Sequence, residues 1–156
     1  MNKIIIILGV ILIAFAGFLF YQFNKTPAKT MSGTTQTVMI NNGSFKVEVV
    51  TDQKEQEIGL IKYTALKPDQ GMLFVFPQKG YHPFWMRGMH FPIDLIFIDG
   101  VKVSAAFENL PPVDSKTPED KITTYGGFIN SEKAVELSAG MIKKYNIKKG
   151  DLVTIK

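Results

Sequence analysis

The chain has 156 residues, of which 46% are hydrophobic and 21% are charged, so it can bury a core and is not a disordered polymer. Its formal net charge of +4 is unevenly placed, because three of the 18 basic residues precede residue 31 whereas all 14 acidic residues follow it. The rest of the chain is nearly balanced in charge, which argues against a nucleic-acid-binding domain, and the absence of cysteine excludes disulfides, thiolate metal sites and a cysteine nucleophile.

The N-terminus carries an uncharged apolar run from Ile4 to Tyr21. As a helix this run would span roughly 27 Å, close to the ~30 Å hydrocarbon thickness of a bilayer. The sequence Ala14-Phe15-Ala16 fits a signal-peptide cleavage site, but it lies inside the run, which favours an uncleaved signal anchor over a cleaved signal peptide. We therefore expect residues 1–23 to form a single-pass transmembrane helix, with residues 4–21 in contact with the lipid bilayer.

The orientation of this segment is not decided by charge, because lysines lie on both sides of it. A lone N-terminal segment ahead of one domain is typical of a signal anchor, and this favours a domain outside the cytoplasm. Residues 24–36 are polar and contain proline and glycine, so we expect a flexible tether to a single domain over residues 37–156.

The first part of that domain carries local signals for a hairpin and a helix. Two strands, Thr37–Ile40 and Phe45–Val50, are joined by Asn41-Asn42-Gly43, a strong hairpin signal. A helix is expected to follow, because Thr51 or Asp52 can cap it and the glutamate at position 55 is placed for a capping box.

The remainder contains many short strands and turns. The predicted elements are a buried strand Met72–Phe76, a strand starting at Phe84-Trp85-Met86, a hairpin over 93–107 through Asp99-Gly100, a proline-rich loop over 109–120, a strand Ala134–Leu137, a short helix Ala139–Tyr145 and a strand Leu152–Ile155. This pattern predicts a mainly β fold, a compact antiparallel β-sandwich or jelly roll with one or two short helices.

Histidine residues flank the aromatic segment YHPFWMRGMHFPID. His82, His90 and Asp94 could together bind a metal ion, since two imidazoles and a carboxylate suit zinc. Pro83 and Pro92 interrupt the segment, so a regular arrangement of these ligands is not assured. We therefore favour turn histidines, and expect neither a metal nor a cofactor.

Four other residues form the candidate ligand-binding pocket. Trp85, the only tryptophan, is either a core residue or the aromatic wall of a pocket, and Arg87 could hold a carboxylate. Asp94 opens an apolar strand, so its carboxylate needs donors, for which Arg87 and the backbone N–H groups of residues 88–90 are candidates. Glu136 alternates with apolar neighbours and is expected to face away from the core, unless it faces Asp94 across a site.

The order of several motifs in this chain resembles the family called domain of unknown function 192. The motifs are Gly59-Leu60, GMLFVF from Gly71, Phe84-Trp85-Met86-Arg87, Pro92-Ile93-Asp94, Glu136-Leu137-Ser138-Ala139-Gly140 and Lys149-Gly150-Asp151. The resemblance covers Thr37 to Lys156. It implies a compact, mainly β fold of sandwich or jelly-roll type and an exported or membrane-anchored location, but no established activity.

The chain departs from the family pattern at two places. Arg87-Gly88-Met89 stands where the family often has Lys-Asn-Thr, and Ile61-Lys62-Tyr63 stands where it often has Met, an aromatic residue and Arg. If those polar groups serve a common site, this chain lacks them, which weighs against an enzyme.

Three hypotheses follow from the sequence. The favoured one is a membrane-tethered binding or accessory module for a small molecule, a peptide or an envelope component, with Trp85, Arg87, Asp94 and Glu136 around the ligand. The alternative is a hydrolase-like enzyme in which Asp94 and Glu136 act as acid, base or metal ligands. The third is a structural interaction module with an exposed apolar patch and no cleft.

Overall fold

The computed structural model describes residues 33–156. The predicted anchor, residues 1–23, and most of the predicted tether lie outside the described residues. Between residues 33 and 156, no helix is long and apolar enough to cross a membrane.

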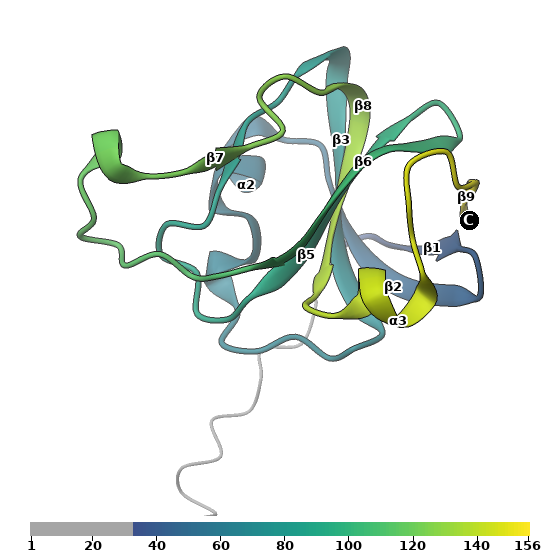
Figure 1. The fold of residues 1–156 in the computed structure, drawn as a ribbon, viewed down its shortest axis with the longest axis horizontal. Helices are drawn as coiled ribbons and strands as arrows, with labels where there is room; N and C mark the ends of the chain where they lie inside the picture. The colour runs from purple at the N-terminus through teal and green to yellow at the C-terminus, as the bar shows by residue number, and fades with distance from the viewer. Residues whose placement is uncertain (1–32) are drawn as a thin grey trace, which may run out of the picture.

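A single curled sheet of seven strands forms the body of the domain, in the order β6-β5-β8-β3-β2-β1-β9 (Figure 1). Its strands are β1 (Thr35–Ile40), β2 (Gly43–Val50), β3 (Gln70–Tyr81), β5 (Ile93–Asp99), β6 (Lys102–Leu110), β8 (Asn130–Ser138) and β9 (Val153–Ile155). A second, two-stranded sheet pairs β4 (Phe84–Trp85) with β7 (Thr124–Tyr125). The fold is mainly β, as predicted, but one curled sheet replaces the predicted pair of packed sheets.

One pair of neighbouring strands is parallel, which the sequence analysis did not predict. The chain crosses over from β2 to β3 through the helix α2 (Gln53–Ile58) and the 3-10 helix η1 (Gly59–Lys62). Such a crossover returns the chain in its original direction, so β2 and β3 run side by side in parallel while the other pairs in the sheet are antiparallel.

Local signals account for the positions of several elements. Asn41 takes a left-handed conformation, with φ of 51°, in the turn between β1 and β2, as the hairpin signal predicts. The Asp52 carboxylate accepts a hydrogen bond of 3.1 Å from the N–H of Glu55, which confirms the predicted helix cap. The helix then stops at Gly59, whose φ of 53° suits a glycine.

The curl of the sheet brings its two outer edges together at one end. The N–H of Val103, near the start of β6, donates to the carbonyl of Asp151 at 2.9 Å, and the N–H of Gly150 donates to the carbonyl of Val103 at 2.8 Å. The short helix α3 (Met141–Tyr145) lies between β8 and this closing segment (Figure 1). The outer edges therefore satisfy part of each other's backbone hydrogen bonds.

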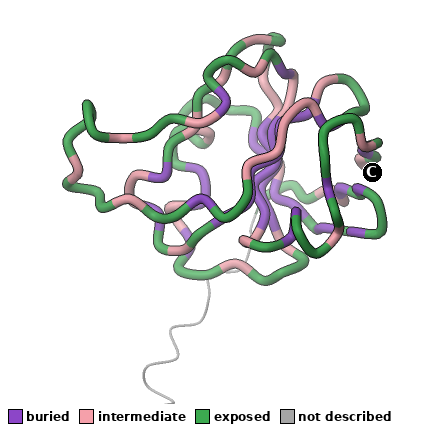
Figure 2. The backbone as a smooth tube through the Cα atoms, in the orientation of Figure 1, coloured by how far each residue is buried: buried purple, intermediate pink, exposed green. Residues whose placement is uncertain are grey.

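Both faces of the sheet are covered. The first core lies on the face of the sheet that carries Phe45, Leu73 and Val135, and it includes Met141 and Ile142 of α3. The second core lies on the opposite face and consists of Val50, Leu60, Tyr63, Met72, Phe74, Met86, Met89, Ile93, Leu95, Phe97, Leu110 and Ala134. Figure 2 shows the buried residues along the central strands, whereas the long loop that carries η2 (Glu119–Lys121) is mostly exposed.

Candidate functional site

The register of strands β2, β3 and β8 places two glutamates, Glu48 and Glu136, in one line across the sheet, on either side of Met72. Glu48 of β2 pairs with Met72 of β3, and Met72 pairs with Glu136 of β8. Residues paired in this way project from the same face, so both carboxyl groups enter the second core, with exposed fractions of only 4% and 5%. The prediction that Glu136 faces away from the core was wrong, because both faces of β8 are covered.

Glu48 is held by a cation and a phenol. Its Oε1 lies 2.5 Å from the Nζ of Lys62, and its Oε2 accepts a hydrogen bond from the hydroxyl of Tyr63. Burial, together with the hydrogen bond to Glu48 and its charge, raises the pKa of Tyr63, so the phenol stays a donor. These contacts fasten η1 and the residue after it to the sheet, which is a structural role for two residues that depart from the family pattern.

Glu136 is in a different situation. Among the described residues, no group forms a hydrogen bond with its Oε2, although this atom is buried. Burial raises the pKa of Glu136 to about 8, because the charged form loses its solvation. A methyl group built on Gly59 would lie 3.9 Å from Oε2, so the carboxyl group abuts the turn that ends α2.

The Glu136 carboxyl group lies at the buried side of a cleft of about 280 Å³. One wall consists of α2 and η1, and the other of aromatic side chains from β3, β4 and the segment between them. The lining residues are Gln53, Gln56, Glu57, Ile58, Gly59, Leu60, Ile61, Phe74, Phe76, His82, Pro83, Phe84, Trp85, Met89 and Glu136. We refer to this feature as the Glu136 cleft.

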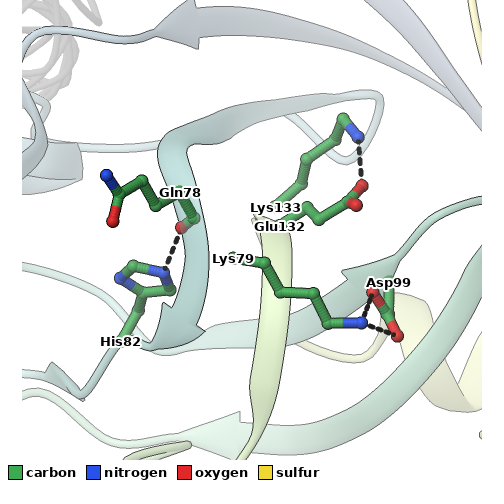
Figure 3. Close-up of polar contacts among 6 residues, drawn as sticks. All are labelled: Gln78, Lys79, His82, Asp99, Glu132 and Lys133. Carbon is green, nitrogen blue, oxygen red and sulfur yellow. Dashed lines mark hydrogen bonds and ion pairs between the residues drawn. The ribbon is translucent and has the colours of Figure 1, made fainter.

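The aromatic wall is held together by ring contacts. The rings of Phe76 and His82 are stacked with centroids 3.6 Å apart, and Phe84 meets Phe74 edge to face at 5.0 Å. His82 also places Nε2 3.2 Å from the carbonyl oxygen of Gln78, as Figure 3 shows. These contacts join side chains of β3, β4 and the segment between them into one wall.

Comparison with known proteins identifies the family of this domain. Residues 36–155 match the family DUF192, described as "Uncharacterized ACR". The chain belongs to the DUF192 family. A search of curated proteins found no match.

Two crystal structures are similar to this DUF192 domain. One is a protein from Sinorhizobium meliloti proposed to be a transcription regulator, with 25% identity, a TM-score of 0.68, and coverage of 81% of this chain and 97% of that one. The other is a protein of unknown function from Novosphingobium aromaticivorans, with 27% identity, a TM-score of 0.63, and coverage of 78% and 84%. These likenesses support the fold and leave the activity of the DUF192 domain open.

The structure brings together two of the four residues that the sequence analysis grouped. Trp85 and Glu136 both line the Glu136 cleft of the DUF192 domain. Trp85 is 46% exposed, so it is not a core residue, and it lies along the cleft. The reason is that β4 pairs with β7 in a separate small sheet and does not join the body of the domain.

Arg87 and Asp94 do not line the cleft. The Nε of Arg87 donates to the carbonyl of Ser115 at 3.0 Å. Asp94 pairs in register with Leu137, so it faces the first core, on the opposite side of the sheet from Glu136. The sheet therefore separates the two carboxyl groups that the hydrolase hypothesis combined.

Asp94 is fully buried and accepts two backbone hydrogen bonds. Its Oδ1 accepts from the N–H of Asn109 at 2.8 Å, and its Oδ2 accepts from the N–H of Ile142 in the first turn of α3 at 2.7 Å. The prediction of a buried acceptor is confirmed, but the predicted partners, Arg87 and residues 88–90, were wrong. The aspartate ties the β5–β6 hairpin and α3 to the centre of the sheet.

The two histidines of the aromatic segment border two different depressions. His82 belongs to the wall of the Glu136 cleft, whereas His90 is exposed and borders a shallower depression with Met89 and Val113. Within residues 33–156, no three histidine, aspartate or glutamate side chains are grouped as they would be to hold a metal ion.

Several residues that line the cleft were not predicted as site residues from the sequence. Gln56 is fixed by its amide nitrogen, which donates to the carbonyls of Val50 and Val75 at 3.2 and 2.9 Å. Phe74 and Phe76 were seen only as part of a buried strand. Their alternation along β3 could have shown that they share a face, but not that α2 leaves this face partly open.

Proposed function

We propose that this DUF192 domain is a small-molecule-binding module, and that the N-terminal segment tethers it to a membrane on the extracytoplasmic side. The observation that carries the binding proposal is the unpaired buried Oε2 of Glu136 beside an aromatic cleft. Ligand pockets are typically apolar and contain a few polar groups that fix the ligand. A buried polar group without a partner costs about 1–3 kcal/mol, which a hydrogen-bonding ligand would recover.

The dimensions of the cleft favour a small molecule over a peptide. Its volume of about 280 Å³ is near the lower end of the range for drug-sized ligands. The same volume of liquid water contains roughly nine water molecules. A peptide would extend beyond these walls, so a compact ligand is the better fit.

The binding proposal can be tested with the only tryptophan as the reporter. Because Trp85 lines the cleft and is 46% exposed, a bound molecule should change its fluorescence. We expect a library of compact, water-soluble fragments, titrated into the full-length protein in lipid nanodiscs, to yield ligands that change the emission saturably. The affinity of the same ligands for the Glu136→Gln variant should be at least tenfold lower than for the parent protein.

The matched control is Glu132→Gln, on the same strand. Glu132 does not line the cleft and forms an ion pair of 3.3 Å with Lys133 (Figure 3). This variant should bind every fragment as the parent does. If no fragment changes the fluorescence saturably, or if Glu132→Gln loses as much affinity as Glu136→Gln, the cleft is not a ligand site.

An enzyme remains the second candidate, and it is favoured by the raised pKa of Glu136. A carboxyl group with a pKa of about 8 can serve as a general acid near neutral pH. Since Asp94 lies on the other face of the sheet, Glu136 would have to act without it. Nuclear magnetic resonance of a bound fragment over hours discriminates the two functions, because an enzyme converts its ligand and a binding module returns it unchanged.

The tether proposal is supported by the apolar run of residues 4–21 and by the lack of a cleavage site after it. We expect full-length protein to stay in the membrane fraction after washing with carbonate and with high salt. Protease added outside intact cells or spheroplasts should digest the domain. A shortened form released to the soluble fraction would contradict the anchor, and protection from protease would contradict the orientation.

A further inference from the structure

We infer that the ligand of the Glu136 cleft is an organic ammonium ion, a protonated primary or secondary amine attached to a compact apolar body. This inference rests on the proposed binding function and specifies the chemistry of its ligand. It is carried by three observations: the charges that line the cleft, the aromatic wall, and the unpaired carboxyl oxygen.

Most of the titratable side chains that line the cleft are acidic, although the chain as a whole is basic. Glu57 and Glu136 line it, whereas no lysine or arginine in residues 33–156 does. The full chain has 18 lysines and arginines and 14 acidic residues. In the described part of the chain, the only other titratable side chain on the walls is the imidazole of His82. An anionic ligand would thus enter a low-dielectric site in which no lysine or arginine of the described residues could pair with it, whereas a cation could pair with the Glu136 carboxylate that forms when this group loses its proton.

The aromatic wall suits a cation with an apolar body. Phe76, Phe84 and Trp85 line the cleft, and a cation placed over an aromatic face gains about 0.5–2 kcal/mol. The apolar part of the ligand would contact Ile58, Leu60 and the rings. A metal ion would gain little from aromatic walls, and among the described residues no three histidine, aspartate or glutamate side chains are grouped as they would be to hold one.

The unpaired oxygen selects an amine that carries N–H groups. In the ionised form of Glu136, Oε2 requires a donor, and an ammonium N–H supplies a charge-assisted hydrogen bond to it. A quaternary ammonium ion lacks that donor and would leave the oxygen unpaired. Primary and secondary amines are therefore preferred.

The proton balance makes binding depend on pH. Burial raises the pKa of Glu136 to about 8, so at neutral pH the free carboxyl group is mostly protonated. Pairing with an ammonium ion requires the carboxylate, so the proton of Glu136 passes to solvent as the amine binds. Affinity should then rise with pH up to about 8, provided that the amine, with a pKa near 10, stays protonated.

The test compares three probes that share a phenylethyl body and differ in charge: 2-phenylethylamine (cationic), 2-phenylethanol (neutral) and 3-phenylpropanoate (anionic). Each is titrated into the full-length protein in nanodiscs, with Trp85 fluorescence as the readout. At pH 8.5 we expect the amine to bind at least tenfold more tightly than the alcohol and the carboxylate to bind most weakly. Between pH 6.5 and pH 8.5 the affinity for the amine should rise on the order of 20-fold, since free Glu136 must lose its proton.

Three variants show which titratable side chain causes the pH dependence of binding. Glu136→Gln should abolish both the preference for the amine and the rise with pH, whereas His82→Gln should retain the rise. Glu57→Gln should retain the rise with pH and lose only a small part of the affinity, because Glu57 is exposed. The comparison of probes in the parent protein needs no variant, so a folding defect would not remove the test.

The outcomes distinguish this inference from the function on which it rests. Equal or tighter binding of the alcohol or the carboxylate would overturn the ammonium inference and leave a small-molecule module. The same holds if none of the three probes binds while other fragments do. If no fragment of any charge binds, both the inference and the proposed function are wrong.

Discussion

Glu136→Gln is expected to raise the free energy of unfolding by about 2–4 kcal/mol at pH 8 and to change it little at pH 4. Folding raises the pKa of this carboxyl group from 4.5 to about 8. Between these values the folded state holds a proton that the unfolded state has released, so the stability of the parent falls as the pH rises through this window. Glutamine resembles the protonated acid at every pH and avoids this loss.

Urea titrations of the full-length protein in mild detergent, followed by Trp85 fluorescence at several pH values, measure this effect. Glu132→Gln, which alters an exposed carboxylate on the same strand, should follow the pH dependence of the parent. Equal stability of Glu136→Gln and the parent at pH 8 would show that the carboxyl group is not held in a desolvated site. A gain of stability coupled to a loss of ligand binding is typical of a residue retained for function.

Asp94→Asn and Asp94→Ala are both expected to lower the free energy of unfolding by about 2–4 kcal/mol. Both carboxylate oxygens accept a buried backbone N–H, one from Asn109 and one from Ile142. Asparagine provides only one acceptor oxygen, and its NH₂ group would face the second N–H. The amide should therefore rescue little of the stability that alanine loses.

The matched control for this prediction is Asp99→Asn at the end of the same strand. Asp99 forms an ion pair of 2.6 Å with Lys79, and both side chains are more than a third exposed (Figure 3). Exposed ion pairs contribute about 0–1 kcal/mol, so this variant should unfold near the urea concentration of the parent. If Asp94→Asn also stayed within about 0.5 kcal/mol of the parent, the two N–H groups would not depend on Asp94.

Features encoded within a few residues were predictable from the sequence. The Asn41-Asn42-Gly43 turn, the Asp52 cap and the Asp99-Gly100 hairpin each depend on the conformation of two to four neighbouring residues, and each occurs as expected. The single curled sheet was not predictable in the same way. It depends on which strands pair, and β3 pairs with β2 and with β8, which follows it by about 50 residues.

The candidate site, like the fold, was predictable from the sequence only in part. Alternation along a strand indicates which residues share a face, but not whether the second face is open to solvent. For this reason Glu136 was expected to face away from the core, and Asp94 was treated as its possible counterpart. The cleft combines residues from α2, β3, β4 and β8, and only the three-dimensional register reveals that Trp85 and Glu136 meet there.

The closure of the sheet has a consequence for the order in which the domain can be completed during synthesis. β9 is the last strand in chain order, yet it pairs with β1, and the segment before it bonds to β6. A chain emerging from a ribosome or a translocation channel would therefore present the edges of β1 and β6 unpaired until β9 follows. Until residues 150–155 have emerged, these backbone groups lack the hydrogen bonds that join the two edges, so completion of the sheet is expected to be among the last steps of folding.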